Sequence, residues 1–181
     1  IVPIYKGPEQ KALVDEKVNA IVAGLKANGI SVKYDDSENT RPGWKFAEYE
    51  LKGVPVRIAI GQKDIENGVV EVARRDTKEK QSIPAADLIE HIKFLMTDIQ
   101  QNLYNRALAY RDSHITPVNS WEEFKQVLNE KGGFISAHWD GTAETEDKIK
   151  EEAKATIRCI PLNNKAEEGV CVFSGKPSKQ R

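Results

Sequence analysis

The chain has 181 residues, of which 39% are hydrophobic and 30% are charged, and its formal net charge at pH 7 is −1. This composition is typical of a soluble globular protein with one large or two small domains, and the near-zero charge argues against a general polyanion binder that acts through a basic field. The apolar runs are short and no charged leader precedes one, so the sequence predicts neither a transmembrane helix nor a signal peptide. Two cysteines are too few for a disulfide framework and indicate reduced thiols. Together these observations predict a cytoplasmic protein without membrane contact.

The first residues alternate between strand and helix patterns. Residues 1–5 form a strand-like run, and a helix is expected from Pro8 to the stop at Asn28-Gly29, because its apolar side chains recur on one face. Residues 30–34 alternate as a second strand. The order strand, helix, strand with short connections predicts a right-handed βαβ unit and a largely parallel sheet.

The next segment changes the character of the sheet. A helix is expected from 42 to 52, followed by the most apolar strand of the chain, 54–60. Asn67-Gly68 is a strong hairpin signal, which predicts that 54–60 pairs with 69–74 in antiparallel fashion. With a further short strand near 82–83, the pattern predicts an α/β fold with a five-stranded mixed sheet flanked by helices.

A long helix is expected from Pro84 to about His114. At about 1.5 Å per residue it spans about 40 Å, which is longer than a compact domain of about 100 residues needs. We therefore expect its far end to belong to a second domain, with domains at 1–100 and 101–181. The second domain has an α+β pattern: a helix at 121–130 with a capping box from Ser120 and Glu123, a strand at 133–139, a helix at 144–155, and strands at 156–162 and 170–173.

Charged residues surround the strand at 54–60. Glu50 ends the helix before it, Arg57 lies within it, and Lys63 and Asp64 open the turn after it. A carboxylate can accept hydrogen bonds from N1 and N2 of guanine, while arginine or lysine can donate to O6 or N7. Because sequence-specific RNA recognition usually targets unstacked loop bases, this rim is a candidate guanine reader. The local charge supports this only weakly, since residues 41–80 hold nine Lys or Arg and seven Asp or Glu, a balance of +2.

The aromatic residues of the same segment have two interpretations. Trp44, Phe46 and Tyr49 are expected to be packing residues of the helix at 42–52. Trp44 is the exception to consider, because it lies near the exposed start of the helix and bases stack well on indole.

The segment PGWKFAEYELKGVPVRIAIGQKD, residues 42–64, resembles the anticodon-binding domain of class II aminoacyl-tRNA synthetases, most closely that of the prolyl-tRNA synthetases of the archaeal and eukaryotic type. The resemblance implies that Glu50, Arg57, Lys63 and Asp64 contact the anticodon and that Lys80 joins them. Because every proline codon begins CC, the matching anticodons end in two guanines. This constant part of the ligand agrees with the donor and acceptor groups of the rim.

The resemblance also implies an enzyme, a proline-tRNA ligase. The intact protein is then expected to use ATP and Mg²⁺ in a catalytic domain that precedes Ile1, and to form a homodimer. The expected partners of this chain are the anticodon loop of tRNA(Pro) and its own catalytic domain. The chain begins with a strand-like run and lacks a start methionine, so it is interpreted as a fragment that binds no cofactor and is inactive alone.

The cysteines depart from the family pattern. Many members carry a four-cysteine zinc site in the carboxy-terminal domain, but here the matching segments read HWDGTAETE and CVFS, which leaves only Cys171. Trp139 and Ser174 occupy the first and last positions. Tetrahedral zinc needs four good ligands. His138 and Cys159 could in principle contribute, but Cys159 lies in a strand-like run and is expected to be a core thiol, so no zinc is predicted.

Other functions have less support in the sequence. His91 and His114 lie on or at the end of the long helix without a nucleophile signature nearby, and neither GxGxxG nor GxxxxGK[ST] occurs. Two alternatives stay open. One is a non-synthetase paralogue that uses an anticodon-type domain as a protein or RNA interaction module. The other is a small flavodoxin-like enzyme at the mouth of the sheet, against which the missing phosphate loop counts.

Overall fold

The computed structural model describes residues 1–181, which divide into two compact units, Ile1–Asn105 and Arg106–Arg181. The first unit contains β1 (Val2–Ile4), α1 (Pro8–Ala27), α2 (Pro42–Leu51), β2 (Val56–Gly61), α3 (Gln62–Glu66), β3 (Val69–Arg74) and β4 (Lys80–Pro84). Helix α4 (Leu88–Ser113) begins in the first unit and ends in the second. The second unit also contains β5 (Ile115–Pro117), α5 (Trp121–Glu130), β6 (Phe134–Ser136), α6 (Ala143–Ala153), β7 (Gly169–Val170) and β8 (Pro177–Ser178).

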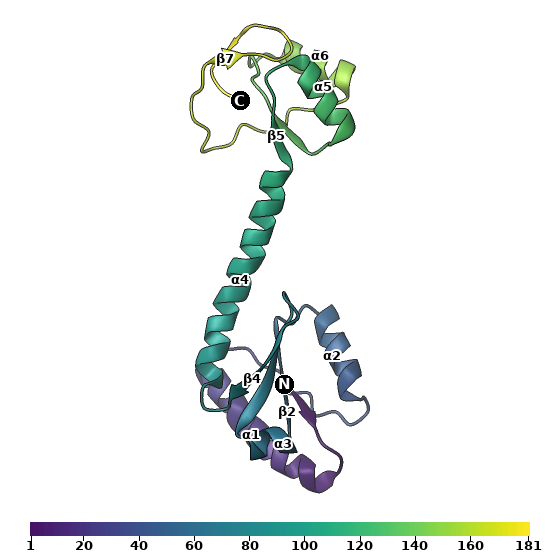
Figure 1. Ribbon diagram of the computed structural model, residues 1–181, viewed down its shortest axis with the longest axis vertical. Coiled ribbons are helices and arrows are strands. Elements are labelled where there is room, and N and C mark those ends of the chain that lie inside the picture. Colours follow the sequence, from purple (N-terminus) through teal and green to yellow (C-terminus); the bar gives the residue numbers. More distant parts are fainter. The chain divides into compact units, whose positions relative to one another are not determined.

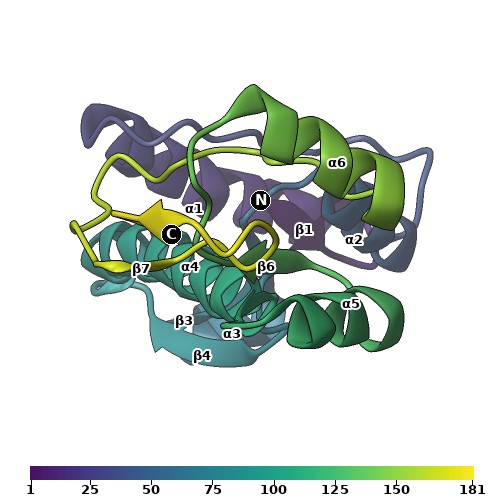
Figure 2. The same ribbon diagram turned by 90° about the horizontal axis from the view of Figure 1, so that it is seen from above.

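The sheet of the first unit is mixed, as the sequence predicts. Its strands follow the order β1-β2-β3-β4, in which β1 and β2 are parallel and the other two pairs are antiparallel. Figure 2 shows β4 as an outer strand beside β3. The predicted pairing of β2 with β3 is confirmed, but α3 stands in the connection before Asn67-Gly68. Gly68 has a φ of +66°, a conformation that glycine adopts without the penalty a side chain brings.

The predicted fifth strand at 30–34 is not part of this sheet, so the prediction of five strands is not confirmed. Two backbone hydrogen bonds join this part of the chain to the residue before β1: the Ile1 nitrogen donates to Lys33 O, and Asp35 N donates to Ile1 O. Both bonds meet Ile1 and none meets β1 itself. One such bridge aligns two segments but does not extend into the ladder that a strand requires.

The two faces of the sheet have different roles. Ile58, Ile60, Val70 and Val72 point to one face and form a core with the buried residues of α1 and α4. Each fully buried side chain of this size contributes about 1.5 to 3 kcal/mol relative to an exposed one. Because side chains alternate along a strand, Arg57 and the neighbours it faces lie on the opposite side, which we call the outer face. Figure 1 shows α2 on the other side of the sheet from α1 and α4.

The second unit has a small core of its own. Strands β5 and β6 are parallel and joined through α5, while β7 and β8 form an antiparallel pair. Trp121 stacks on Phe124 at 4.8 Å between ring centroids and meets the edge of Phe173 at 4.8 Å. The predicted cap of α5 is present, since Ser120 Oγ accepts a hydrogen bond from Glu123 N at 3.2 Å.

Three strand predictions in the second unit differ from the structure, and of the predicted strand 133–139 only β6 forms. The segment 156–162 forms no strand: its apolar Leu162 is fully exposed and Pro161 lacks a backbone donor, so no pairing edge develops. The predicted strand 170–173 shrinks to β7, because Cys171 N bonds to Lys176 O and Gly175 N bonds to Cys171 O around a turn. Cys159 is exposed and not the predicted core thiol.

None of the helices combines the length and apolar composition needed to cross a lipid bilayer.

Candidate nucleic-acid interface

Helix α2 is fixed to the first unit by a buried lysine. Lys45 is 3% exposed, and its Nζ donates to Asp35 O at 2.9 Å and to Ser37 O at 2.7 Å while it pairs with the Asp35 carboxylate at 3.2 Å. Tyr49 Oη also donates to that carboxylate, at 2.8 Å. Burial raises the pKa of Asp35, but hydrogen bonds from Ser37, Tyr49 and Lys45 outweigh it and hold the pKa well below its ordinary value. These contacts determine where α2 lies.

Arg57 is the most buried cation of the outer face. Its side chain is 10% exposed, and its guanidinium carbon lies 3.4 Å from the centroid of the Phe46 ring of α2. Phe46 is therefore a packing partner of Arg57. Burial lowers the pKa of Arg57, and the Glu71 and Glu50 carboxylates oppose this shift. One of its terminal nitrogens, Nη1, is buried and has no hydrogen-bond partner in the structure.

Two further charged residues lie beside Arg57 on the outer face. The register pairs Arg57 of β2 with Ala73 of β3, and Ala73 with Lys80 of β4. Glu71, two residues before Ala73 on the same face, pairs with Arg57 Nη2 at 3.7 Å and with Lys80 Nζ at 3.9 Å. We call Glu50, Arg57, Glu71 and Lys80 the outer-face cluster. Its Glu71 was missed by the sequence analysis, although the alternation of β3 and the hairpin signal together point to it.

Glu50 reaches this cluster from the end of α2. Its side chain is exposed, and its backbone oxygen accepts a hydrogen bond from Arg75 Nε at 2.8 Å. The backbone nitrogen of Arg75 donates to Pro55 O at 2.9 Å. Arg75 therefore fixes the last turn of α2 against the start of β2, and this places the Glu50 carboxylate near Arg57.

The structure places Lys63 and Asp64 apart from the outer-face cluster. They lie on α3, after the end of β2, whereas Arg57 lies near the start of the same strand. The four residue steps from Arg57 to Gly61 span about 13 Å of extended chain. Asp64 Oδ2 accepts a hydrogen bond from Gly61 N at 2.8 Å and so closes the first turn of α3, while Lys63 is exposed.

The arrangement offers a base edge both donors and acceptors. Arg57 and Lys80 are donors, Glu50 and Glu71 are acceptors, and the exposed Lys63 offers another donor further along. Trp44 is 56% exposed, so its indole ring is available for a base to stack on. A surface of this kind suits one or two splayed bases better than a phosphate backbone, because two of the four cluster charges are negative.

A separate open pocket lies at the turn after β1. It is lined in part by Tyr5, Lys6, Lys11 and Lys45. Lys11 pairs with Asp15 at 2.7 Å, and Lys45 is held by Asp35 and by backbone carbonyls. Two of the three lysines are thus already neutralised, which argues against a phosphate site for a flavodoxin-like enzyme.

The two segments that the sequence resemblance aligns with a zinc site are linked by hydrogen bonds. Asp140 accepts from Ser174 Oγ at 2.6 Å, from Thr142 Oγ1 at 2.8 Å and from Thr145 Oγ1 at 2.8 Å. Burial raises the pKa of Asp140, but these hydrogen bonds outweigh it and keep the pKa well below its ordinary value. Cys171 is the only thiol present there. A single thiol beside a carboxylate occupied by hydroxyl donors does not fit tetrahedral zinc, and no cluster of three His, Cys, Asp or Glu side chains could hold a metal.

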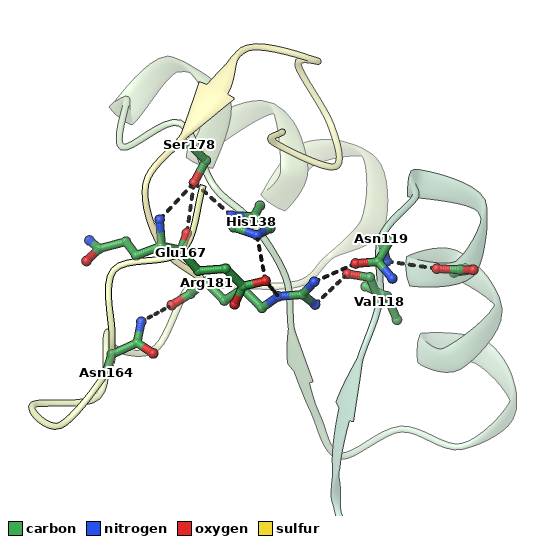
Figure 3. Close-up of polar contacts among 9 residues, drawn as sticks. Val118, Asn119, His138, Asn164, Glu167, Ser178 and Arg181 are labelled. Carbon is green, nitrogen blue, oxygen red and sulfur yellow. Dashed lines mark hydrogen bonds and ion pairs between the residues drawn. The ribbon is translucent and has the colours of Figure 1, made fainter. Parts of the chain in front are cut away.

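His138 is also engaged in structural contacts. Its Nδ1 lies 3.2 Å from Ser178 Oγ and its Nε2 lies 3.4 Å from Glu167 Oε1, and Arg181 Nε donates to the same carboxylate oxygen at 3.2 Å (Figure 3). A Cβ at Gly169 would lie 2.3 Å from His138 Nε2, so only glycine allows this close approach. The network ties the last residues of the chain to the rest of the second unit.

His91 and His114 show no catalytic arrangement. The Nε2 of His91 is buried without a hydrogen-bond partner, and His114 stacks on Tyr110 at 4.0 Å between ring centroids. Neither has a serine or cysteine nucleophile aligned with a base and its orienting group. Ser113 Oγ does lie 3.0 Å from His114 Nδ1, but that nitrogen also lies 2.7 Å from Tyr110 O.

Comparisons with known proteins point to one family. Residues 1–95 match the family described as "Anticodon binding domain", and residues 121–181 match "Prolyl-tRNA synthetase, C-terminal". A protein of Christiangramia forsetii named proline-tRNA ligase is 56% identical over 181 residues, which cover 100% of this chain and 37% of the relative. Proteins with the same name from Flavobacterium johnsoniae and Porphyromonas gingivalis are 58% and 57% identical over all 181 residues. The chain spans 37% and 36% of the lengths of these two relatives.

Proposed function

We propose that this chain, which belongs to the family of anticodon-binding domains, recognises the anticodon loop of tRNA(Pro) as the tRNA-selecting part of a prolyl-tRNA synthetase. The observation that carries the proposal is the identity of 56% to 58% over the whole chain with relatives named proline-tRNA ligase. The two matched families also occur in the order expected for such a protein.

Selection in this proposal depends on buried and unpaired polar groups. The Arg57 side chain, 10% exposed beside the Phe46 ring, is one donor, and a guanine offers O6 and N7 as acceptors. A base without matching acceptors leaves that donor unpaired, which costs about 1 to 3 kcal/mol. Glu50 accepts from the guanine N1 and N2 donors, and Lys80 adds a further donor. Lys63 and Asp64, about one strand length away, read the neighbouring base.

The role of the longer protein follows from the same proposal. It ligates proline to tRNA(Pro) in the cytoplasm, as a homodimer, with ATP and Mg²⁺ bound by a catalytic domain that this chain does not include. The chain alone binds the anticodon loop but does not charge the tRNA, and it binds no zinc. The predicted archaeal and eukaryotic type is not supported, because the similar proteins are bacterial.

The proposal is tested by binding. The affinity of the 181-residue chain is measured for a stem-loop RNA that carries the anticodon UGG and for the same stem-loop with both guanines replaced by adenines. We expect the first RNA to bind more tightly. Glu50→Ala and Arg57→Ala are each expected to weaken its binding by about 1 to 3 kcal/mol, the scale of a good bidentate base contact.

Circular dichroism of both variants serves as the control for folding. Equal affinity of the unchanged chain for the two RNAs contradicts anticodon reading and favours the alternative, an interaction module of a non-synthetase paralogue.

A further inference from the structure

Glu71 lies at the centre of the outer-face cluster. Its Oε1 is the atom that pairs both with Arg57 Nη2, at 3.7 Å, and with Lys80 Nζ, at 3.9 Å. The two cations come from different strands on either side of β3. A single carboxylate oxygen therefore links the donor of β2 to the donor of β4.

The surroundings of Glu71 leave it open to a ligand. The register places Ala59 and Ser82 directly beside it on β2 and β4, and Ala73 follows on the same face of β3. These side chains are small, and Glu71 remains 40% exposed although its strand is an inner one. The carboxylate thus stands on a patch of small residues bordered by two cations.

The distances show that Glu71 attracts both cations without forming a direct hydrogen bond to either. Both pairs are longer than a direct hydrogen bond, so the attraction is mainly that of charge. Lys80 is 56% exposed, whereas the Arg57 side chain is only 10% exposed. Lys80 therefore offers a base an accessible donor and Arg57 offers the small exposed part of its side chain, although the positions of both are restrained.

The negative charge also affects which part of an RNA can bind. Two cations alone would attract any phosphate, whereas a carboxylate between them repels one. The edge of guanine, which carries donors as well as acceptors, does not suffer this repulsion. Glu71 therefore favours a base over the backbone at this position.

We propose that Glu71 is a positioning and selectivity residue, which holds Arg57 and Lys80 at the spacing that reads a base and excludes phosphate from the space between them. This proposal rests on the proposed function, because it assumes that the outer face binds the anticodon loop. If Glu71 only neutralised positive charge, it would instead lower the affinity for both RNAs by the same factor. A purely structural ion pair would support folding without affecting selection.

The test measures selection rather than affinity alone. The full chain and its Glu71→Gln variant are titrated with the UGG stem-loop and with the guanine-replaced stem-loop. We expect the affinity ratio between the two RNAs to fall about tenfold in the variant, the scale of one good base contact. Binding of the replaced loop is expected to stay unchanged or become tighter, because the repulsion of phosphate is lost.

Matched variants separate this effect from others. Glu90→Gln removes the same charge from an exposed position on α4 and is expected to keep the ratio of the unchanged chain. Lys80→Met and Glu71→Gln are also combined in one chain. The fold reduction of the affinity ratio in this double variant is expected to be smaller than the product of the reductions in the two single variants, because both residues act through one contact. Glu71→Asp retains the charge but withdraws it by one methylene, and an intermediate ratio is expected.

An unchanged or raised ratio in Glu71→Gln overturns the inference while leaving the proposed function intact. If Glu71→Gln does not fold, the Glu71→Asp variant decides instead: an affinity ratio equal to that of the unchanged chain overturns the inference. If the unchanged chain itself does not distinguish the two RNAs, both the proposed function and this inference are wrong.

Discussion

At the scale of single residues, the charged groups of the first unit divide into two kinds. Lys45 and Asp35 are held by direct hydrogen bonds within the fold, whereas Arg57 and Lys80 pair with Glu71 only at 3.7 and 3.9 Å. The sequence alone does not separate them, because lysine and arginine look equally solvated in a charged segment. Burial and hydrogen-bond partners make the distinction, and they identify which cations can meet a ligand.

Asp35 is the residue for which a pH effect is expected. Its pKa in the folded chain lies below the ordinary value of 3.8, so its ionised form stabilises the fold. That contribution is complete above about pH 4 and is lost as the pH falls further, when the carboxylate becomes protonated. Asp35→Asn leaves Lys45 buried without its charge partner and is expected to cost about 3 kcal/mol at pH 7.

Urea unfolding of both proteins between about pH 2.5 and pH 7 measures this effect. The acid-induced loss of stability is expected to be smaller in Asp35→Asn, whereas Asp36→Asn, at the exposed neighbouring position, should behave like the unchanged chain. Identical pH profiles for Asp35→Asn and the unchanged chain would contradict the assignment.

At the scale of elements, α2 and β3 together build the candidate interface. Arg75 and Lys45 fix the two ends of α2, so that Phe46 covers Arg57 and Glu50 lies near it. The antiparallel register of β2, β3 and β4 aligns Arg57, Ala73 and Lys80 in one row. A slip of one residue in β3 would turn Glu71 to the core face.

The second unit offers an element-scale prediction about metal. Asp140 connects the start of α6 to the turn at Ser174 through hydroxyl donors. Asp140→Ala leaves several of these donors unpaired and is expected to destabilise the unit by about 1 to 3 kcal/mol. EDTA is expected to leave the thermal unfolding midpoint of the unchanged chain where it is.

Differential scanning calorimetry with and without EDTA, together with metal analysis of the purified chain, checks both expectations. Stoichiometric zinc or a lowered midpoint in EDTA would contradict the hydrogen-bonded arrangement. Asp147→Ala, at an exposed position of α6, is the matched control for loss of a carboxylate.

At the scale of the whole molecule, the net charge of −1 limits how RNA can be bound. Eight cations of the first unit already pair with acidic side chains, and each phosphate contact to single-stranded RNA contributes about −0.7 to the slope of log affinity against log salt. We expect a slope of about −2 for the UGG stem-loop, measured by titration between about 50 and 300 mM KCl. A slope steeper than about −5 would indicate that phosphate contacts dominate, contrary to base reading.

The sequence by itself determined most of the local structure. Helical periodicity located α1, α2 and α4, and Asn67-Gly68 indicated the antiparallel pairing of β2 with β3, since these signals depend on neighbouring residues. The family was also readable from the segment 42–64, because a motif is a property of the chain.

Only the tertiary structure decided which residues meet. Glu71 joins Arg57 and Lys80 because strand register brings three separate segments together, and register is a property of hydrogen-bonded pairs of strands. For the same reason the predicted strand 30–34 remained outside the sheet: its pattern is suitable, but the only bridge beside it is to Ile1, the residue before β1. Local pattern determines the form that a segment can take, whereas long-range contacts determine its partners.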